Sequence, residues 1–258
     1  MSLIFILLGT FFLLAFLGVP IAISLGVASG IAQRMFAGVD SFSYLAIPMF
    51  MLAGKLMEYG GISARIVQVA KILCAKVRGG LAITSIVACS FFAALSGSAP
   101  ATVSAIGGIM YPEMLKDGYD EEFAGGMISV AGNLGPLIPP SILMVTIGVC
   151  TGVSISDMFL GGIVIGILLA AVFCLTAYVI CRRRNYGGSG QTYSSKEKWR
   201  IFWSAMPALG MPIIILGGIY GGYFTPTEAS VVAVVYGIIV SFCIYREITV
   251  KPVSYTHL

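Results

Sequence analysis

The chain has 258 residues, of which 58% are hydrophobic and only 10% are charged, and its net charge is +4 at pH 7. A soluble domain is far less apolar, so this composition excludes one and predicts an all-α, polytopic membrane protein. Such a small positive charge indicates basic cytoplasmic loops rather than binding to nucleic acid.

The N-terminal apolar run, residues 3–32, is too long for the apolar core of a cleavable signal peptide. At about 1.5 Å per residue it is also too short for two full spans and a turn. We therefore expect one tilted helix that kinks at residues 18–20. A short second span, residues 44–57, follows it.

Residues 62–77 have an amphipathic pattern, with cations between the apolar positions. The expected apolar stripe consists of Ile62, Ile66, Val69, Leu73 and Val77. Two interpretations fit this pattern equally: a helix that lies in the membrane interface, or a surface helix packed on neighbouring protein. In neither case does the helix span the membrane.

Two apolar segments that follow, 80–110 and 123–150, are interrupted by small residues and prolines at 96–102 and 132–141. Proline removes a backbone donor, and a carbonyl freed in hydrocarbon needs a partner, so such breaks indicate a binding site within the membrane. The second arm of the first segment is too short to cross, which predicts a re-entrant hairpin with both ends at one face. The other segment is predicted to be a broken helix.

An ordinary span is expected at residues 157–180, and two more at 201–219 and 230–245. The loop between the first two carries six cations, which predicts that it is cytoplasmic: Arg182, Arg183, Arg184, Lys196, Lys198 and Arg200. Residues 221–230 then form an external turn. Its Glu228 is interpreted as an N-terminal helix charge rather than a proton carrier, and Asp157 is interpreted in the same way.

Oxygen atoms of the two breaks are the candidate ligands for an ion or substrate. The candidate residues are Ser96, Gly97, Ser98, Thr102, Gly132, Asn133, Gly135 and Ser141. Hydroxyls, an amide and backbone carbonyls can replace the water around a sodium ion without any carboxylate, and we expect sodium at Ser96, Ser98 and Asn133. The alternative is close packing at helix crossings, which we favour for Ser104 and Thr146. Four prolines are expected to have a structural role at the breaks rather than a ligand role, because proline fixes a bend and has no N–H to donate: Pro100, Pro136, Pro139 and Pro140.

Enzymatic classes find little support in the chain. Its only histidine is His257, and its six cysteines show no metal-binding spacing. An intramembrane protease needs a serine paired with histidine or lysine, or two aspartates, within spans, and the predicted spans hold neither arrangement. A channel or scaffold accounts for the spans but not for two central breaks. We expect a carrier, not an enzyme.

Three stretches carry a family resemblance: SGSAPATVSAIGGIMYPEM, AGNLGPLIPPSI and GGYFTPTEAS. In this order and spacing they resemble the large membrane (M) subunit of tripartite ATP-independent periplasmic (TRAP) transporters. The resemblance implies an elevator-type, sodium-coupled importer of small organic acids (carboxylates) in the bacterial cytoplasmic (inner) membrane. It also implies a small membrane (Q) subunit and a periplasmic substrate-binding (P) subunit as partners, and no cofactor besides the coupling ion. A stand-alone carrier of the same superfamily is the alternative.

The resemblance also implies an inverted repeat, of which this chain holds the first half and the opening of the second, so we expect a truncated protein. Five regions are predicted in chain order: scaffold spans with an interfacial arm helix (1–78), a transport region (79–181), a basic cytoplasmic loop (182–200), the first spans of the second repeat (201–252), and a tail (253–258). A common transposase sequencing adapter encodes the tail in one reading frame, which predicts a foreign segment.

Overall fold

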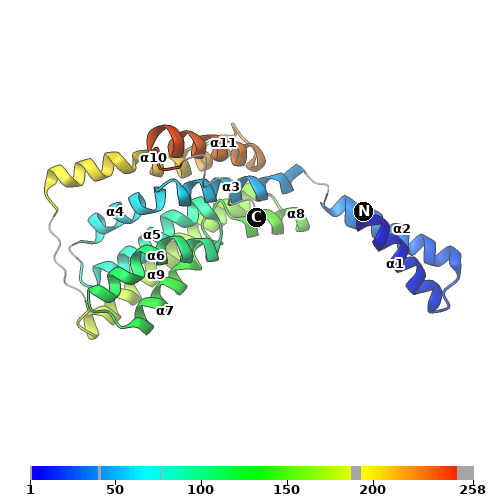
Figure 1. Ribbon diagram of the computed structural model, residues 1–258, viewed down its shortest axis with the longest axis horizontal. Helices are drawn as coiled ribbons and strands as arrows, with labels where there is room; N and C mark the ends of the chain where they lie inside the picture. Colours follow the sequence, from blue (N-terminus) through cyan, green and yellow to red (C-terminus); the bar gives the residue numbers. More distant parts are fainter. Residues whose placement is uncertain (1, 40–41, 76, 187–192, 249–258) are drawn as a thin grey trace. The chain divides into compact units, whose positions relative to one another are not determined.

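The computed structural model describes residues 2–39, 42–75, 77–186 and 193–248, and secondary structure in this part of the chain is entirely helical (Figure 1). The chain divides into two compact units, residues 1–45 and 46–258. The predicted all-α class is confirmed. The foreign tail predicted at 253–258 lies outside the described residues.

The first unit contains α1 (Ser2–Phe16), α2 (Ile21–Val39) and a short 3₁₀ helix (Phe42–Leu45). The expectation of one kinked helix over residues 3–32 is wrong, because α1 and α2 are separate helices that pack against each other. Gly18 adopts the left-handed conformation with φ of 80°, and Pro20 has no N–H to continue α1, so the chain reverses between them. Two short helices joined by this tight turn need less chain than two full spans.

The second unit holds the remaining helices. They are α3 (Ala46–Tyr59), α4 (Ile62–Cys74), α5 (Gly80–Ser96), α6 (Ala99–Lys116), α7 (Glu121–Gly132), α8 (Ile142–Thr151), α9 (Ile155–Arg183), α10 (Ser195–Tyr220), α11 (Pro226–Ile238) and a π-helix (Ile239–Ile244). Helix α5 lies at the centre of this unit, in contact with α3, α4, α6, α7, α9 and α10. Most of its side chains are buried, among them Ile86, Phe92 and Leu95. The first arm of the first interrupted segment is thus the central helix of this unit, and it has little contact with solvent or lipid.

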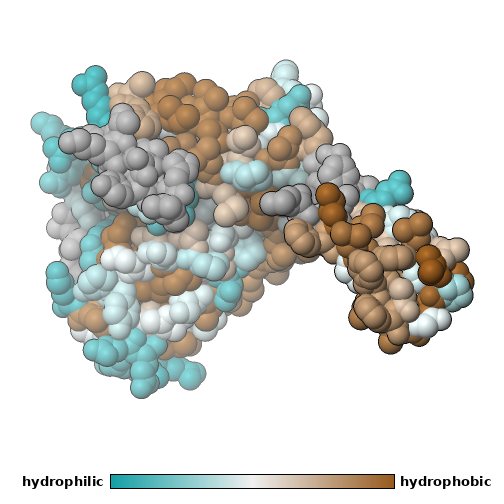
Figure 2. All heavy atoms as spheres, turned by 45° about the vertical axis from the view of Figure 1, so that its right-hand side comes forward, coloured by the Kyte–Doolittle hydropathy of each residue, from teal (hydrophilic) through white to brown (hydrophobic). Residues whose placement is uncertain are grey.

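Three helical segments in the described part of the chain are long and apolar enough to cross a membrane: 155–183, 195–220 and 226–244. They match the spans predicted at 157–180, 201–219 and 230–245. Helix α9 buries few of its side chains, and eight of its exposed ones are large and aliphatic: Leu160, Val164, Ile165, Ile167, Leu168, Val172, Leu175 and Val179. Apolar side chains cover broad areas of both units (Figure 2). Multi-pass membrane insertion explains this exposure.

Helix α4 packs against α5 and α10, so the interpretation of residues 62–77 as a helix packed on neighbouring protein describes most of its apolar face. Ile62, Ile66 and Val69 are buried, whereas Leu73, expected on the same stripe, is 63% exposed. The helix ends at Cys74, three residues before the predicted end.

The turn before α11 confirms the interpretation of Glu228. The Thr225 N–H and hydroxyl both donate to the Glu228 carboxylate at 2.8 Å, and the Glu228 N–H donates to the Thr225 hydroxyl at 3.3 Å. This reciprocal arrangement is a capping box, which satisfies backbone donors that have no partner within the helix.

Candidate functional site

The first break separates α5 from α6 at Gly97 and Ser98. Gly97 adopts a left-handed φ of 60°, and its N–H donates to the Ala93 carbonyl oxygen at 2.9 Å, which ends α5. Pro100 lies in the first turn of α6, where its missing N–H costs nothing. The structural role predicted for Pro100 therefore fits its position.

Three oxygen atoms form a small triangle at this break. The Ser96 and Thr102 hydroxyl oxygens lie 2.9 Å apart, the Thr102 hydroxyl donates to the Ser98 carbonyl oxygen at 2.8 Å, and the Ser96 hydroxyl lies 3.4 Å from the same carbonyl. Ser96 is 5% exposed and Thr102 is fully buried. The fold thus collects three hard oxygen atoms in a protected place.

The second break runs from the end of α7 at Gly132 to the start of α8 at Ile142. Its first residues form tight turns, with the Gly135 N–H donating to the Gly132 carbonyl oxygen and the Ile138 N–H to that of Leu134, both at 2.9 Å. Pro136 and the cis-linked pair Pro139 and Pro140 follow in the non-helical stretch. Buried Ser141 then caps α8 by accepting the Met144 N–H at 3.4 Å.

The two breaks touch each other through their backbones, as a site that takes ligands from both of them requires. A Cβ atom added to Gly97 would lie 2.5 Å from the Pro140 carbonyl oxygen, and one added to Gly135 would lie 2.7 Å from the Ser98 carbonyl oxygen. Only glycine permits backbones to approach this closely without displacement. The depth of the breaks in the membrane stays a prediction.

Gly132 makes a third close approach between the segments. A Cβ atom added there would meet the Val103 side chain at 2.1 Å and the Ala99 carbonyl oxygen at 3.5 Å. Gly132 thus packs against α6, one helical turn beyond the contact that Gly135 makes.

Asn133 does not join the triangle. Its side chain is exposed, and its amide nitrogen donates to the Ser129 carbonyl oxygen of its own helix at 3.4 Å. Of the three residues at which we expected sodium, Ser96 contributes a buried hydroxyl to the triangle and Ser98 its carbonyl oxygen. Thr146, for which we favoured packing, donates to the Ile142 carbonyl oxygen within α8 at 2.9 Å.

Three glycines that the sequence reasoning missed hold the breaks against their surroundings. On α9, a Cβ at Gly162 would lie 2.7 Å from the Leu137 carbonyl oxygen, and one at Gly166 would lie 2.6 Å from the Ile138 side chain. On α3, Gly54 faces the Ser96 Cα atom at 3.3 Å. The four-residue spacing of Gly162 and Gly166 within an apolar helix is a known signal for close helix packing, so it was detectable in the sequence.

Four helix ends surround the contact: the C-terminal ends of α5 and α7 and the N-terminal ends of α6 and α8. Helix C-terminal ends carry partial negative charge and N-terminal ends partial positive charge. Neither break contains an ionisable side chain. The arrangement therefore provides partial charges and neutral oxygen atoms for both a cation and an anion.

Comparison with known proteins identifies a family that matches almost the whole chain. The family model described as "Tripartite ATP-independent periplasmic transporter, DctM component" matches residues 3–256. The large permease protein DctM of a C4-dicarboxylate TRAP transporter from Vibrio cholerae is 46% identical over 245 residues, which are 89% of this chain and 54% of that protein.

Other relatives carry different substrates in their names. The 2,3-diketo-L-gulonate TRAP transporter large permease protein YiaN of Escherichia coli is 42% identical over 218 residues, 84% of this chain and 51% of its own. The isethionate TRAP transporter permease protein DctMQ of Oleidesulfovibrio alaskensis is 40% identical over 257 residues, 95% of this chain and 40% of its own. The chain spans about half the length of the curated relatives that it matches. These relatives are transporter permeases, not enzymes.

Proposed function

Because this chain belongs to the family of the DctM component of tripartite ATP-independent periplasmic transporters, we propose that it forms part of a membrane permease that imports small organic acids together with sodium ions. The observation that carries the proposal is the backbone contact between the two breaks, Gly97 against Pro140 and Gly135 against Ser98. Discontinuous helices whose ends meet in this way form the ion and substrate sites of secondary transporters.

The oxygen triangle of Ser96, Ser98 and Thr102 is the proposed sodium site. Its longest edge, 3.4 Å, equals the spacing of about 3.4 Å between neighbouring ligands around a hard cation bound octahedrally at about 2.4 Å. The edges of 2.8 and 2.9 Å are hydrogen bonds, so a bound ion replaces them and moves these oxygen atoms slightly apart. The carbonyl end of α5 adds favourable potential for the cation. Gly132, Gly135 and Ser141 line the opposite side of the contact, and Asn133 is the least supported of the proposed ligands.

Substrate, partners and location follow from the same family. The names of the relatives include a C4-dicarboxylate, a diketogulonate and isethionate, so small organic anions are the proposed substrate class. A periplasmic binding protein delivers the substrate, and a small membrane subunit completes the permease in the bacterial inner membrane. The proposed transport region, 79–181, moves as a unit against the scaffold in an elevator-type cycle with the hairpin re-entering the bilayer.

The ion site is tested on this chain by thermal unfolding in detergent. Sodium chloride is expected to raise the unfolding temperature above that in potassium chloride at equal ionic strength, because an ion that binds only the folded state stabilises it. Ser96→Ala and Thr102→Val each remove one oxygen ligand and are expected to weaken sodium binding by about 1 to 3 kcal/mol. Ser98→Ala keeps the carbonyl ligand, so a smaller effect is expected from it.

Ser104→Ala is the matched control, because Ser104 lies on α6 beyond the break and is exposed. It is expected to keep the full difference between sodium and potassium. The same sodium response in Ser96→Ala, Thr102→Val and Ser104→Ala would remove the triangle from the ion site. Uptake of a labelled dicarboxylate by a permease of the relatives' length, reconstituted with both partner subunits, tests the transport activity itself.

A further inference from the structure

A groove between α4 and α10 lies apart from the two breaks and has a volume of about 360 Å³, within the range of small-molecule sites. From α4 it is lined by Val69, Ile72 and Leu73. Helix α10 contributes Ser195, Lys198, Trp199 and Phe202. Six of these seven side chains carry no charge, and Lys198 is the one charged group in the lining.

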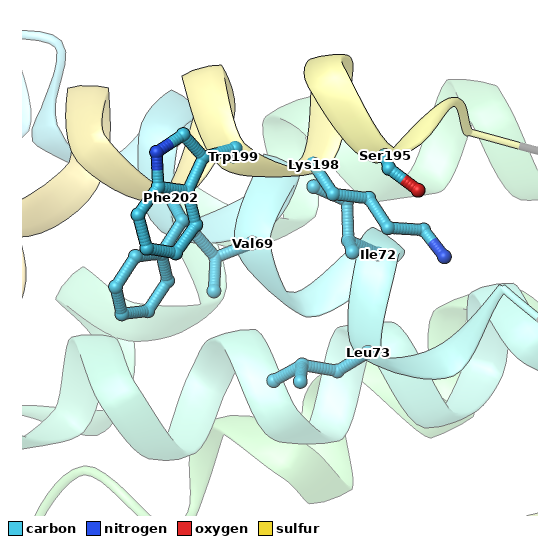
Figure 3. Close-up of a pocket in the computed structure, with 7 residues that line it drawn as sticks. All are labelled: Val69, Ile72, Leu73, Ser195, Lys198, Trp199 and Phe202. Carbon is cyan, nitrogen blue, oxygen red and sulfur yellow. The ribbon is translucent and has the colours of Figure 1, made fainter.

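Polar and apolar groups are separated along this groove. In Figure 3, the Ser195 hydroxyl and the Lys198 ammonium lie toward one end, and the Trp199 and Phe202 rings lie toward the other. Leu73 and Trp199 are each 63% exposed, so the apolar end is open to the surroundings. A ligand that fits such a groove has an anionic or polar head joined to an apolar chain.

The charges around the polar end favour an anionic head. The first turns of α10 carry Lys196, Lys198 and Arg200 against the single acid Glu197. The Glu197 carboxylate accepts the Ser194 N–H at 2.9 Å, which holds it at the helix N-terminus, and Glu197 does not line the groove. Lys198 is therefore the charged group best placed to meet a phosphate.

The aromatic residues locate this groove at a membrane surface. Trp199 packs edge-on against Trp203, with ring centroids 5.7 Å apart, and stacks with Phe202 at 6.4 Å. Tryptophan concentrates where lipid headgroups meet acyl chains, and basic pockets between helices at the cytoplasmic side bind anionic headgroups. Lys198 and Trp199 are adjacent at the start of α10, where the preference of tryptophan for the headgroup region and that of lysine for anionic headgroups coincide.

We propose that the groove between α4 and α10 binds one anionic phospholipid, with its phosphate at Lys198 and Ser195 and an acyl chain along Leu73, Trp199 and Phe202. The proposal goes beyond transport and rests on the proposed function only in requiring that the chain be embedded in a membrane. Bound in this way, the lipid fills the gap between the amphipathic helix and the span.

The two tryptophans of the chain, Trp199 and Trp203, provide the test. In Trp203→Phe the remaining fluorophore, Trp199, lines the groove. The protein is reconstituted into vesicles that contain phosphatidylglycerol or phosphatidylcholine with brominated acyl chains, which quench tryptophan fluorescence on contact. Half-maximal quenching of Trp199 is expected at an about fivefold lower mole fraction of brominated phosphatidylglycerol, the scale of one lysine near an anionic lipid.

Two lysines on the same helix separate the groove from general attraction to the bilayer. Lys198→Gln is expected to abolish the preference, whereas Lys196→Gln, whose exposed side chain does not line the groove, is expected to keep it. In Trp199→Phe, the remaining Trp203 packs beside position 199 without lining the groove, so a weaker preference for brominated phosphatidylglycerol is expected than with Trp199. Far-ultraviolet circular dichroism checks that each variant is folded. If Lys198→Gln does not fold, competition by unbrominated phosphatidylglycerol against unbrominated phosphatidylcholine at Trp199 replaces it.

Equal quenching of Trp199 by the two brominated lipids would overturn the proposal. So would a preference that Lys198→Gln leaves unchanged, or equal competition by the two unbrominated lipids. Absence of quenching by either lipid would show that protein, not lipid, fills the groove. None of these readouts depends on sodium binding or uptake, so the lipid site and the proposed function fail independently.

Discussion

Single glycines decide whether the two breaks can meet. Gly97 combines a left-handed φ of 60° with a position where a Cβ atom would lie 2.5 Å from the Pro140 carbonyl oxygen. A side chain there is opposed both by its own backbone and by the facing segment, and the facing atom belongs to a backbone that cannot turn aside. Both the local backbone conformation and the contact with the facing segment therefore require glycine at position 97.

Gly97→Ala is expected to destabilise the folded protein by more than the about 1 to 2 kcal/mol that a left-handed conformation costs, because the clash with Pro140 adds to it. The measurement is the free energy of unfolding in mixed micelles. Gly126→Ala is the control, since a Cβ at Gly126 meets no atom within 4 Å and its position lies inside α7. Equal stability of Gly97→Ala and Gly126→Ala would show that the breaks separate in solution.

Asp117, in the turn after α6, is an acid in an unfavourable position. One of its carboxylate oxygens is buried without a hydrogen-bond partner, and burial raises the pKa of this carboxyl above its ordinary value of 3.8. It also follows the C-terminal end of α6, where negative charge is unfavourable. Because the folded state holds the proton more tightly than the unfolded state, ionisation of Asp117 costs stability.

Asp117→Asn is accordingly expected to raise the unfolding temperature at pH 7. The cost in the wild type is fully present above the raised pKa of the folded state, and it disappears as the pH falls through that value toward 3.8. The difference in unfolding temperature between variant and wild type should therefore shrink on acidification. Thermal unfolding across roughly pH 3.5 to 7.5 measures it. Asp120→Asn makes a useful contrast, because Asp120 binds Arg184 and Tyr186, and its loss should lower the unfolding temperature.

Ion pairs join helices that are distant in the chain. Arg65 on α4 lies 2.8 Å from the Glu247 carboxylate and stacks over the Tyr245 ring at 3.7 Å from its centroid. Lys71, also on α4, pairs with Glu113 on α6 at 2.5 Å. Helix α4 is thus attached at one point to the segment after the π-helix and at another to α6.

Arg65→Gln is expected to destabilise the protein by about 1 to 2 kcal/mol, the sum of a partly exposed ion pair and a cation–π contact. Arg65→Lys keeps the charge but loses the planar group that stacks on Tyr245, so about half of the loss is expected. Chemical unfolding of both variants in about 50 mM and about 500 mM salt, where the Debye length is about 14 Å and about 4 Å respectively, separates the ion pair from the stacking contact. A full loss in Arg65→Lys at low salt would assign the whole effect to stacking.

At the scale of the whole molecule, the charge pattern predicts which ends of the spans face the cytoplasm. The loop before α10 carries the cations, and the turn before α11 lies at the other end of that helix. Thr227, in the turn that is predicted to be external, is 5% exposed and unsuitable as a labelling position, whereas Tyr223 is 80% exposed. The structure thereby selects the residue for the topology experiment.

In a variant without the six native cysteines, a membrane-impermeant thiol reagent added to intact cells is expected to modify Tyr223→Cys and to spare Lys196→Cys. Lys196 is exposed, so its protection would reflect the membrane and not burial. Lysing the cells first should make both positions reactive. Modification of Lys196→Cys alone in intact cells would invert the proposed orientation of every span.

Features that depend on local backbone chemistry were predictable from the amino-acid sequence alone. Prolines and small residues placed both helix interruptions, apolar length placed the spans that became α9 and α10, and Thr225 with Glu228 announced a helix start. These features can be predicted from the sequence because each depends on residues that are only a few positions apart. The contacts between distant segments were not predictable in this way: Gly97 meets Pro140 more than forty residues further along the chain, the Asn133 side chain lies outside the oxygen triangle, and α1 packs against α2. Such contacts depend on the packing of distant segments, whose energy is shared among many side chains and is written in no single stretch of sequence.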